Sequence, residues 1–164
     1  MGKLDLYHEY RDQMKTGDLL QFSGRGLISK IIQWKTGGKW SHSSIIIRFE
    51  EYDRLMTFTA EPNGFMPILL SRYLREYDGE CWWFPLKDEL DAGRLEVGKK
   101  ALDMSGKPYD YTSLFKQLIG DVSTNMSSLF CSEACYLAYG YCGVAPNPNN
   151  ILNMSLFKEG SKLL

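Results

Sequence analysis

The sequence has no excess of charge of either sign. It contains 19 basic and 20 acidic residues among 164, which gives a formal net charge of −1 at pH 7. A chain without a positive field has no general attraction for a nucleic-acid backbone, so we expect no nucleic acid among its partners. Its length suits one well-buried domain, here residues 1–164, and is short for two.

Long apolar runs are also missing. No run approaches the ~20 residues that cross a bilayer, so we expect no membrane span. The segment 1–10 alternates charged and apolar residues and lacks the apolar centre of a signal peptide. Leu6 stands where a myristoylation motif requires Ser or Thr. These features predict a cytoplasmic protein.

Cysteine is scarce, with four residues in the chain: Cys81, Cys131, Cys135 and Cys142. In a chain without an export signal we expect free thiols rather than disulfides. The last three follow a Cys-x3-Cys-x6-Cys spacing, which does not match the paired Cys-x2-Cys knuckles of structural zinc sites, and no histidine lies near them. We therefore expect no metal and no cofactor.

Hydrophobic periodicity predicts one α+β domain with strands early and helices late. The first fifteen residues have weak helical periodicity, and a second helix should follow Leu27 and end at Gly37. Strands are expected at 19–22, 45–49, 55–60 and 81–84, which favours an antiparallel sheet or small barrel. Further helices are expected at 91–104, from Asp110 to about 119, and from about Leu129 to Tyr139, followed by an irregular tail.

Cys131 is the candidate nucleophile because of its place near the start of the last expected helix. If that helix begins at Ser127 or Ser128, the thiol lies in the first turn, where unpaired N–H groups and the helix dipole stabilise a thiolate. Cys135 lies one turn further in, and we expect it to be a core residue, like Cys81 and Cys142. Taken alone, Cys131 fits a core thiol equally well.

The candidate base is chosen from only two histidines. His8 lies in a charged amphipathic stretch and is expected to be solvated. His42 lies between two serines, beside Trp40, just before the expected strand 45–49. A histidine in such a place is often only a surface or hydrogen-bonded residue, but if Cys131 has an imidazole partner, it is His42.

A third group should hold the imidazole in one tautomer. If the strands on either side of residues 50–53 form a hairpin with its turn centred between Glu51 and Tyr52, then Glu61 lies opposite His42. Side chains directly opposed on one face are ~5 Å apart at Cβ. A solvated strand-end glutamate explains Glu61 equally well, and Asn63 is a weaker substitute.

The chain resembles the circularly permuted branch of the NlpC/P60 papain-like superfamily, the YiiX/YebB-like group. Ordered stretches spanning roughly residues 15 to 140 carry the resemblance: Gly17-Asp18-Leu19-Leu20-Gln21-Phe22, Trp40-Ser41-His42-Ser43-Ser44-Ile45, Ala60-Glu61-Pro62-Asn63-Gly64, and Gly106-Lys107-Pro108-Tyr109-Asp110-Tyr111 followed by Phe130-Cys131-Ser132-Glu133. The resemblance implies an α+β papain-like fold with permuted topology, in which a small antiparallel barrel or sheet packs against helices. It also implies Cys131 at a helix N-terminus as nucleophile, His42 as base and Glu61 as orienting group, with Tyr109 lining the site.

These residues predict a papain-like cysteine hydrolase or acyl-transfer enzyme of the peptidase or amidase type. His42 takes the proton of Cys131, and the thiolate attacks an amide, ester or thioester carbonyl to form an acyl-enzyme. The backbone N–H of Cys131 is a candidate oxyanion donor.

A small-molecule, peptide, isopeptide or lipid-like substrate fits this chemistry. Trp40 is a candidate substrate-binding residue, and a set of apolar side chains could form either an acyl pocket or core: Trp34, Trp40, Phe65, Met66, Trp82 and Trp83. Two other classes stay open, a non-catalytic lipid- or peptide-binding module on the same fold and a thiol redox or zinc protein that uses Cys135.

Overall fold

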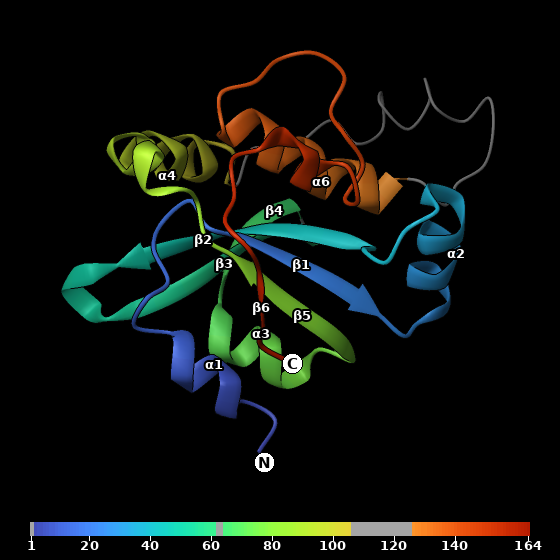
Figure 1. Ribbon diagram of the computed structural model, residues 1–164, viewed down its shortest axis with the longest axis horizontal. Helices are drawn as coiled ribbons and strands as arrows, with labels where there is room; N and C mark the ends of the chain where they lie inside the picture. Colours follow the sequence, from blue (N-terminus) through green and yellow to red (C-terminus); the bar gives the residue numbers. More distant parts are fainter. Residues whose placement is uncertain (1, 62–63, 106–125) are drawn as a thin grey trace.

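A six-stranded antiparallel sheet forms the centre of the molecule (Figure 1). The computed structural model describes residues 2–61, 64–105 and 126–164. In chain order the elements are α1 (Asp5–Tyr10), β1 (Leu19–Gly24), α2 (Leu27–Thr36), β2 (His42–Phe49), the 3-10 turn η1 (Glu50–Tyr52), β3 (Arg54–Glu61), β4 (Gly64–Leu69), α3 (Leu70–Glu76), β5 (Gly79–Phe84), η2 (Asp88–Gly93), α4 (Arg94–Asp103), α6 (Met126–Ala138), η3 (Ile151–Met154) and β6 (Ser161–Lys162).

The strand order is β4-β3-β2-β1-β5-β6, and each neighbouring pair is antiparallel. In the described residues β4 and β6 are the two edges, so the sheet is open. Of the two forms expected, barrel or sheet, the sheet is correct. β4 was missed in the sequence because Pro67 interrupts its pattern, and an edge strand tolerates a proline since one side needs no hydrogen bonds.

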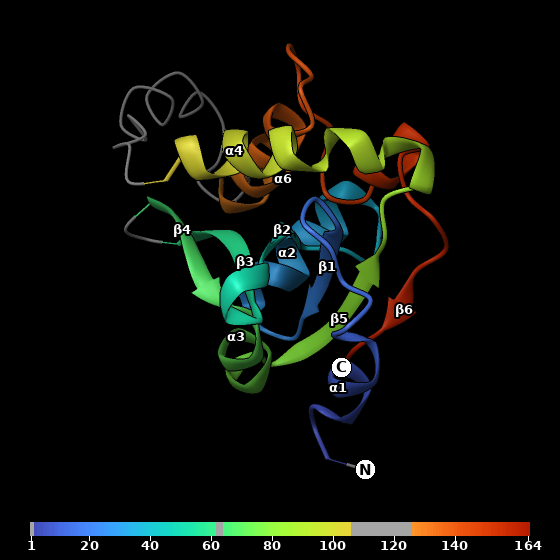
Figure 2. The same cartoon turned by 90° about the vertical axis from the view of Figure 1, so that its left-hand side faces the viewer.

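Each face of the sheet has its own core, because successive strand residues point to opposite faces. On one face Ile46 and Phe22 pack with α1 and α3, whose contributions include Tyr7, Leu70 and Leu74. On the other face the core is formed by β-strand residues together with α4 and α6: Leu19, Ile45, Ile47, Phe58, Phe65, Ala101, Ala134, Cys135, Ala138 and Ile151. Figures 1 and 2 show these layers, with α4 and α6 on one side of the sheet and α1 and α3 on the other.

The β2–β3 hairpin has the predicted register. Ile45 pairs with Phe58, and the ladder continues to Phe49 and Arg54. Glu50–Tyr52 form a single 3-10 turn, and Asp53 closes it in the left-handed region with φ of 44°. Continued three residues beyond Ile45, the same register sets His42 opposite Glu61.

Several predicted boundaries were wrong. β2 begins at His42, so this histidine is the first residue of the strand and does not precede it. The helix expected over 91–104 begins as the 3-10 segment η2 and becomes α-helical only at Arg94. The last helix begins at Met126, three residues before the predicted start. The helix expected from Asp110 lies outside the described residues.

A buried carboxylate joins the sheet to α4. Asp18 is 1% exposed and accepts hydrogen bonds from Trp83 Nε1 at 2.8 Å, the Leu86 amide at 3.0 Å and Arg94 Nη1 at 2.6 Å. The Lys15 amide also donates to it at 3.0 Å, so three neutral donors and one guanidinium compensate the desolvation of the charge. This carboxylate is therefore structural, although it lies in one of the stretches that carry the family resemblance.

Candidate active site

His42 is a largely buried imidazole at the first position of β2. It pairs with Phe22 of β1, and the two ring centroids are 5.5 Å apart. A hydrogen bond of 2.6 Å joins its Nε2 to Oγ1 of Thr59, which is completely buried. Burial lowers the pKa of His42 from 6.5 to about 4. The ring is therefore neutral at neutral pH, the state that a general base needs.

Thr59 belongs to a row of buried hydroxyl groups that the sequence analysis missed. Thr57 and Thr59 alternate on one face of β3, and Ser44 of β2 bonds to Thr57 through their hydroxyls at 2.6 Å. The Thr-Phe-Thr alternation over 57–59 was readable as a strand with a polar face. What it could not reveal was that this face is buried and that its last hydroxyl contacts His42.

The chain entering β2 is held by hydrogen bonds. The Trp40 amide donates to Oδ1 of Asn149 at 2.8 Å, and Nδ2 of Asn149 donates to the Trp40 carbonyl at 3.0 Å. Gly38 allows this approach, because a Cβ there would lie 2.3 Å from the Asn149 side chain. Ser41 is buried, and its amide donates to the Phe22 carbonyl at 2.9 Å. The segment that leads to His42 is thus fixed at two consecutive backbone positions, 40 and 41.

Cys131 is the sixth residue of α6 as the structure describes it, one or two residues further from the helix start than a beginning at Ser127 or Ser128 would place it. The side chain of Cys131 lies outside the described residues. Position 131 precedes Cys135 by one helical turn and Ala138 by about two, so it shares their row on the helix.

The other cysteines divide between core and surface. Cys135 and Cys81 are completely buried, each in one of the two cores, as predicted. Burial raises the pKa of the Cys81 thiol well above its ordinary value. Cys142 is exposed, so its prediction as a core residue was wrong; it follows the end of α6 in an irregular segment.

The described side chains bring His42 together with Thr59 and Phe22, on the face that carries α3. Ala134, Cys135 and Ala138 of α6 pack on the opposite face. His42 is the first residue of β2, so it stands at one end of the sheet. In Figure 1 the first turn of α6 lies at the same end of the molecule as α2.

Of the remaining predicted site residues, some have side chains within the described part of the structure and others do not. Glu61 is the last residue of β3, and its side chain lies outside the described residues, as do Asn63 and Tyr109. Trp40 is half-buried and makes edge-on ring contacts with Trp82 and Phe84. Glu133, two positions after Cys131, is partly buried, and this burial raises its pKa.

The apolar residues considered for an acyl pocket do not form one. Trp83 and Phe65 are buried in different cores, one on each face of the sheet. Trp34 is 81% exposed on α2 and Met66 is 43% exposed on β4. Only Trp40 and Trp82 remain together, with Nζ of Lys39 within 4.8 Å of both ring centroids.

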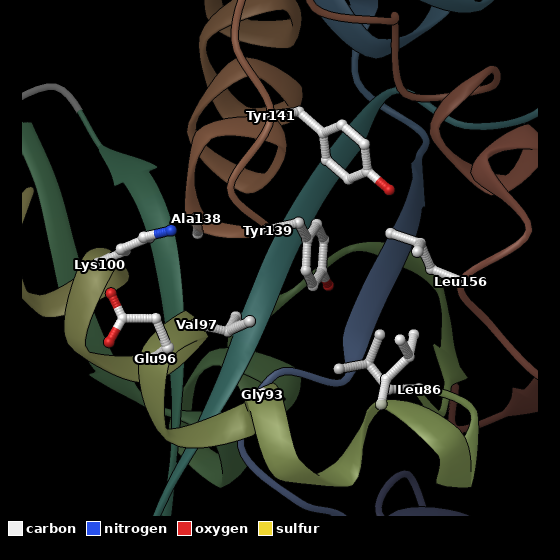
Figure 3. A pocket seen from close by; sticks show the side chains of 10 residues that line it. Leu86, Gly93, Glu96, Val97, Lys100, Ala138, Tyr139, Tyr141 and Leu156 are labelled. Atoms are coloured by element: carbon white, nitrogen blue, oxygen red, sulfur yellow. The ribbon is translucent and has the colours of Figure 1, made fainter.

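A cavity of about 250 Å³ lies at the other end of α6 (Figure 3). Its lining is mostly apolar and comes from β5–η2, α4, the end of α6 and the C-terminal segment: Leu86, Leu90, Gly93, Glu96, Val97, Lys100, Ala138, Tyr139, Tyr141 and Leu156. Position 138 lies seven residues beyond Cys131, roughly 10 Å along a helix. The cavity includes none of the predicted catalytic residues, and we do not assign it to the reaction.

Within the described ranges, no cluster of three His, Cys, Asp or Glu side chains is arranged to hold a metal ion. Among the helices of those same ranges, none has the length and apolar content that crossing a bilayer requires.

The open antiparallel sheet, with His42 beginning an internal strand and the cysteine-bearing helix later in the chain, is the arrangement of a permuted papain-like protein. A family model described as "Permuted papain-like amidase enzyme, YaeF/YiiX, C92 family" matches residues 13–163. The chain belongs to this family. The match confirms the predicted resemblance and the permuted papain-like fold, and the family it names is one of papain-like amidases.

A solved structure with the same fold is described as the metalloprotein yiiX from Escherichia coli O157:H7. It shares 22% sequence identity with this chain and has a TM-score of 0.58. The alignment covers 77% of this chain and 65% of that protein, so the chain spans just under two thirds of its length. No match was found among the curated proteins.

Proposed function

We propose that residues 1–164 act as one catalytic domain, a cysteine hydrolase or acyl-transfer enzyme with Cys131 as nucleophile and His42 as base. The thiol proton passes to the imidazole as the thiolate attacks an amide, ester or thioester carbonyl. Collapse of the tetrahedral adduct expels the leaving group, which takes the proton from the imidazolium, and leaves an acyl-enzyme. Water or another acceptor then attacks the acyl-enzyme and releases Cys131.

The observation that carries this proposal is the environment of His42 in a chain of this family. A partly buried, neutral imidazole bonded through Nε2 to a buried hydroxyl is positioned and unprotonated. With Nε2 held by Thr59, Nδ1 is the nitrogen that takes the Cys131 proton. Glu61, opposite His42 in the continued register, would then stabilise the imidazolium that forms.

Labelling by a thiol-directed probe tests the nucleophile. Because Cys142 is exposed and would react with any alkylating agent, the experiment uses a Cys142→Ser background. We expect one labelled cysteine, Cys131, reacting well below pH 8.5 because the neutral imidazole takes the thiol proton. Cys131→Ala should remove the label, and His42→Gln should shift the alkylation profile toward that of a free thiol.

Peptide mapping by mass spectrometry identifies the labelled residue. A label on Cys135 would contradict the assignment. A Cys131 profile with an ordinary thiol pKa would favour the alternative function, a binding module that keeps the fold without the chemistry. Activity of the same variants on amide and ester libraries would then identify the bond that is cleaved.

A further inference from the structure

α2 presents its apolar side to solvent. Leu27 and Trp34 are 77% and 81% exposed, and Ile31 between them is partly exposed. Residues at i, i+4 and i+7 lie along one side of a helix. In a surface helix of a globular protein such a stripe normally faces the core, so α2 has the reverse orientation.

The inward side of α2 is fixed mainly by polar contacts. Nε2 of Gln33 donates to Oγ of Ser23 at 3.0 Å and to the Lys39 carbonyl at 2.9 Å. Oγ1 of Thr36 accepts from Nδ2 of Asn149 at 2.8 Å, and Ile32 is buried beside them. These bonds hold the helix in this rotation, so the outward stripe is a fixed feature of the surface.

Positive charge surrounds the stripe. The sequence has no Asp or Glu from Leu19 to Phe49, although the whole chain has a net charge of −1. Lys30 and Lys35 fall on the two flanks of the stripe at helical spacing, and within the described part of the chain neither forms an ion pair. Arg25 precedes the helix and pairs only loosely with Asp78, at 3.8 Å.

We propose that α2 is a docking helix for the surface of an anionic lipid bilayer. The stripe Leu27–Ile31–Trp34 would lie in the boundary between headgroups and acyl chains, with the lysines on the lipid phosphates. Tryptophan favours this boundary because its ring is apolar and its N–H is polar. A ten-residue helix, roughly 15 Å long, lies in this plane and does not enter the bilayer further.

The charges favour a bilayer over a second copy of the chain. Two α2 helices packed stripe to stripe would bring the lysines of one copy toward those of the other, and like charges repel. An anionic bilayer surface instead attracts the basic side chains on both sides of the stripe. The docking does not depend on the proposed hydrolase activity.

The position of α2 also bears on the substrate, and this step rests on the proposed function. The helix connects to His42 through residues 37–41, in which the backbone of Trp40 is held by Asn149 and that of Ser41 by the Phe22 carbonyl. A bilayer on α2 would therefore lie toward the end of the sheet that carries His42. Among the substrates of the proposed enzyme, this favours acyl-chain lipids.

Flotation of the wild-type chain with vesicles tests the docking. We expect binding to phosphatidylcholine vesicles that contain phosphatidylglycerol, and weak binding to phosphatidylcholine alone. Trp34→Ala and Leu27→Ala should each weaken binding roughly tenfold, because each removes a large apolar side chain from the contact. Lys30→Ala with Lys35→Ala should weaken it about 30-fold, from about fivefold per lysine near an anionic surface.

Matched controls are available elsewhere on the protein surface. Tyr52→Ala and Leu95→Ala remove side chains that are 73% and 68% exposed outside α2, and both variants should bind like wild type. Absence of vesicle binding, or equal binding by the α2 variants, would overturn the proposal. A concentration-dependent dimer that Trp34→Ala abolishes, without vesicle binding, would overturn it in favour of self-association. Cys131 labelling is unaffected by any of these results, so docking and catalysis fail separately.

Discussion

At the residue scale, the environment of His42 determines its charge. Its ring packs on Phe22 and bonds to Thr59, and desolvation lowers its pKa to about 4. The unfolded chain titrates near 6.5. Folding therefore favours the neutral ring. Protonation of the ring lowers the free energy of unfolding, because the unfolded chain binds this proton more tightly than the folded protein does.

This difference predicts a pH-dependent stability. The contribution is fully present above about pH 6.5 and is lost as the pH falls toward about 4, because the unfolded state then binds a proton that the folded state excludes. Between pH 7 and pH 5 the loss is about 2 kcal/mol. Urea unfolding at both pH values measures it, and His42→Gln serves as the reference in which only the remaining groups titrate. Equal pH dependence in the two proteins would show that His42 is not held neutral.

At the element scale, β3 carries two buried threonines on one face with different partners. Thr57 bonds to Ser44, whereas Thr59 bonds to His42. Both side chains are completely buried, so replacing either hydroxyl by a methyl group carries a similar structural cost. The two positions therefore form a matched pair in which only one contact involves the proposed base.

Thr59→Val should change the histidine, and Thr57→Val should not. Loss of the Oγ1 partner leaves Nε2 without this bond, so the imidazole should populate both tautomers, which nitrogen-15 NMR of the ring resolves. We expect the rate of Cys131 labelling to fall by roughly tenfold to a hundredfold, in the range of losses for an orienting partner. Thr59→Ser should restore both the wild-type tautomer ratio and the wild-type rate of Cys131 labelling. An unchanged tautomer ratio in Thr59→Val would refute the positioning role even if labelling of Cys131 is confirmed.

At the scale of the whole molecule, Asp18 links parts of the chain that are far apart in sequence. Its carboxylate accepts hydrogen bonds from Trp83 of β5, from the amide of Leu86 just beyond β5, and from Arg94, the first residue of α4. Arg94 also donates to Asp91 at 2.6 Å and to the Thr16 carbonyl at 2.8 Å. The linkage holds α4, and with it one wall of the core beneath α6, against the sheet.

Removing this charge should destabilise the entire fold. Asp18→Asn leaves Arg94 buried with only Asp91 as a counter-charge, and breaking one side of such a pair costs about 3–5 kcal/mol. Chemical denaturation of wild type and variant gives the difference in the free energy of unfolding. Asp53→Asn is the control, because Asp53 pairs with Arg11 and Arg48 at the surface, where an ion pair contributes about 0–1 kcal/mol. A loss for Asp18→Asn no larger than for Asp53→Asn would contradict this role.

The sequence by itself determined four of the six strands, the hairpin register and the choice of His42 as candidate base. These follow from local pattern: a β-branched run marks 45–49, and a turn between two strands fixes which residues face each other. The ordered motifs and the scarcity of histidine then selected the candidate pair and the family.

Only the tertiary structure decided which polar groups are buried and which apolar ones are not. Thr59, Asn149 and Asp18 acquire their roles from partners distant in the sequence, which no local periodicity encodes. The periodicity of α2 predicted a helix but gave no sign that its apolar stripe faces outward, because rotation is set by the bonds of Gln33 and Thr36 to other elements. The helical pattern in a sequence shows that a helix has an apolar stripe, but only the packing of the helix decides whether that stripe faces the core or the solvent.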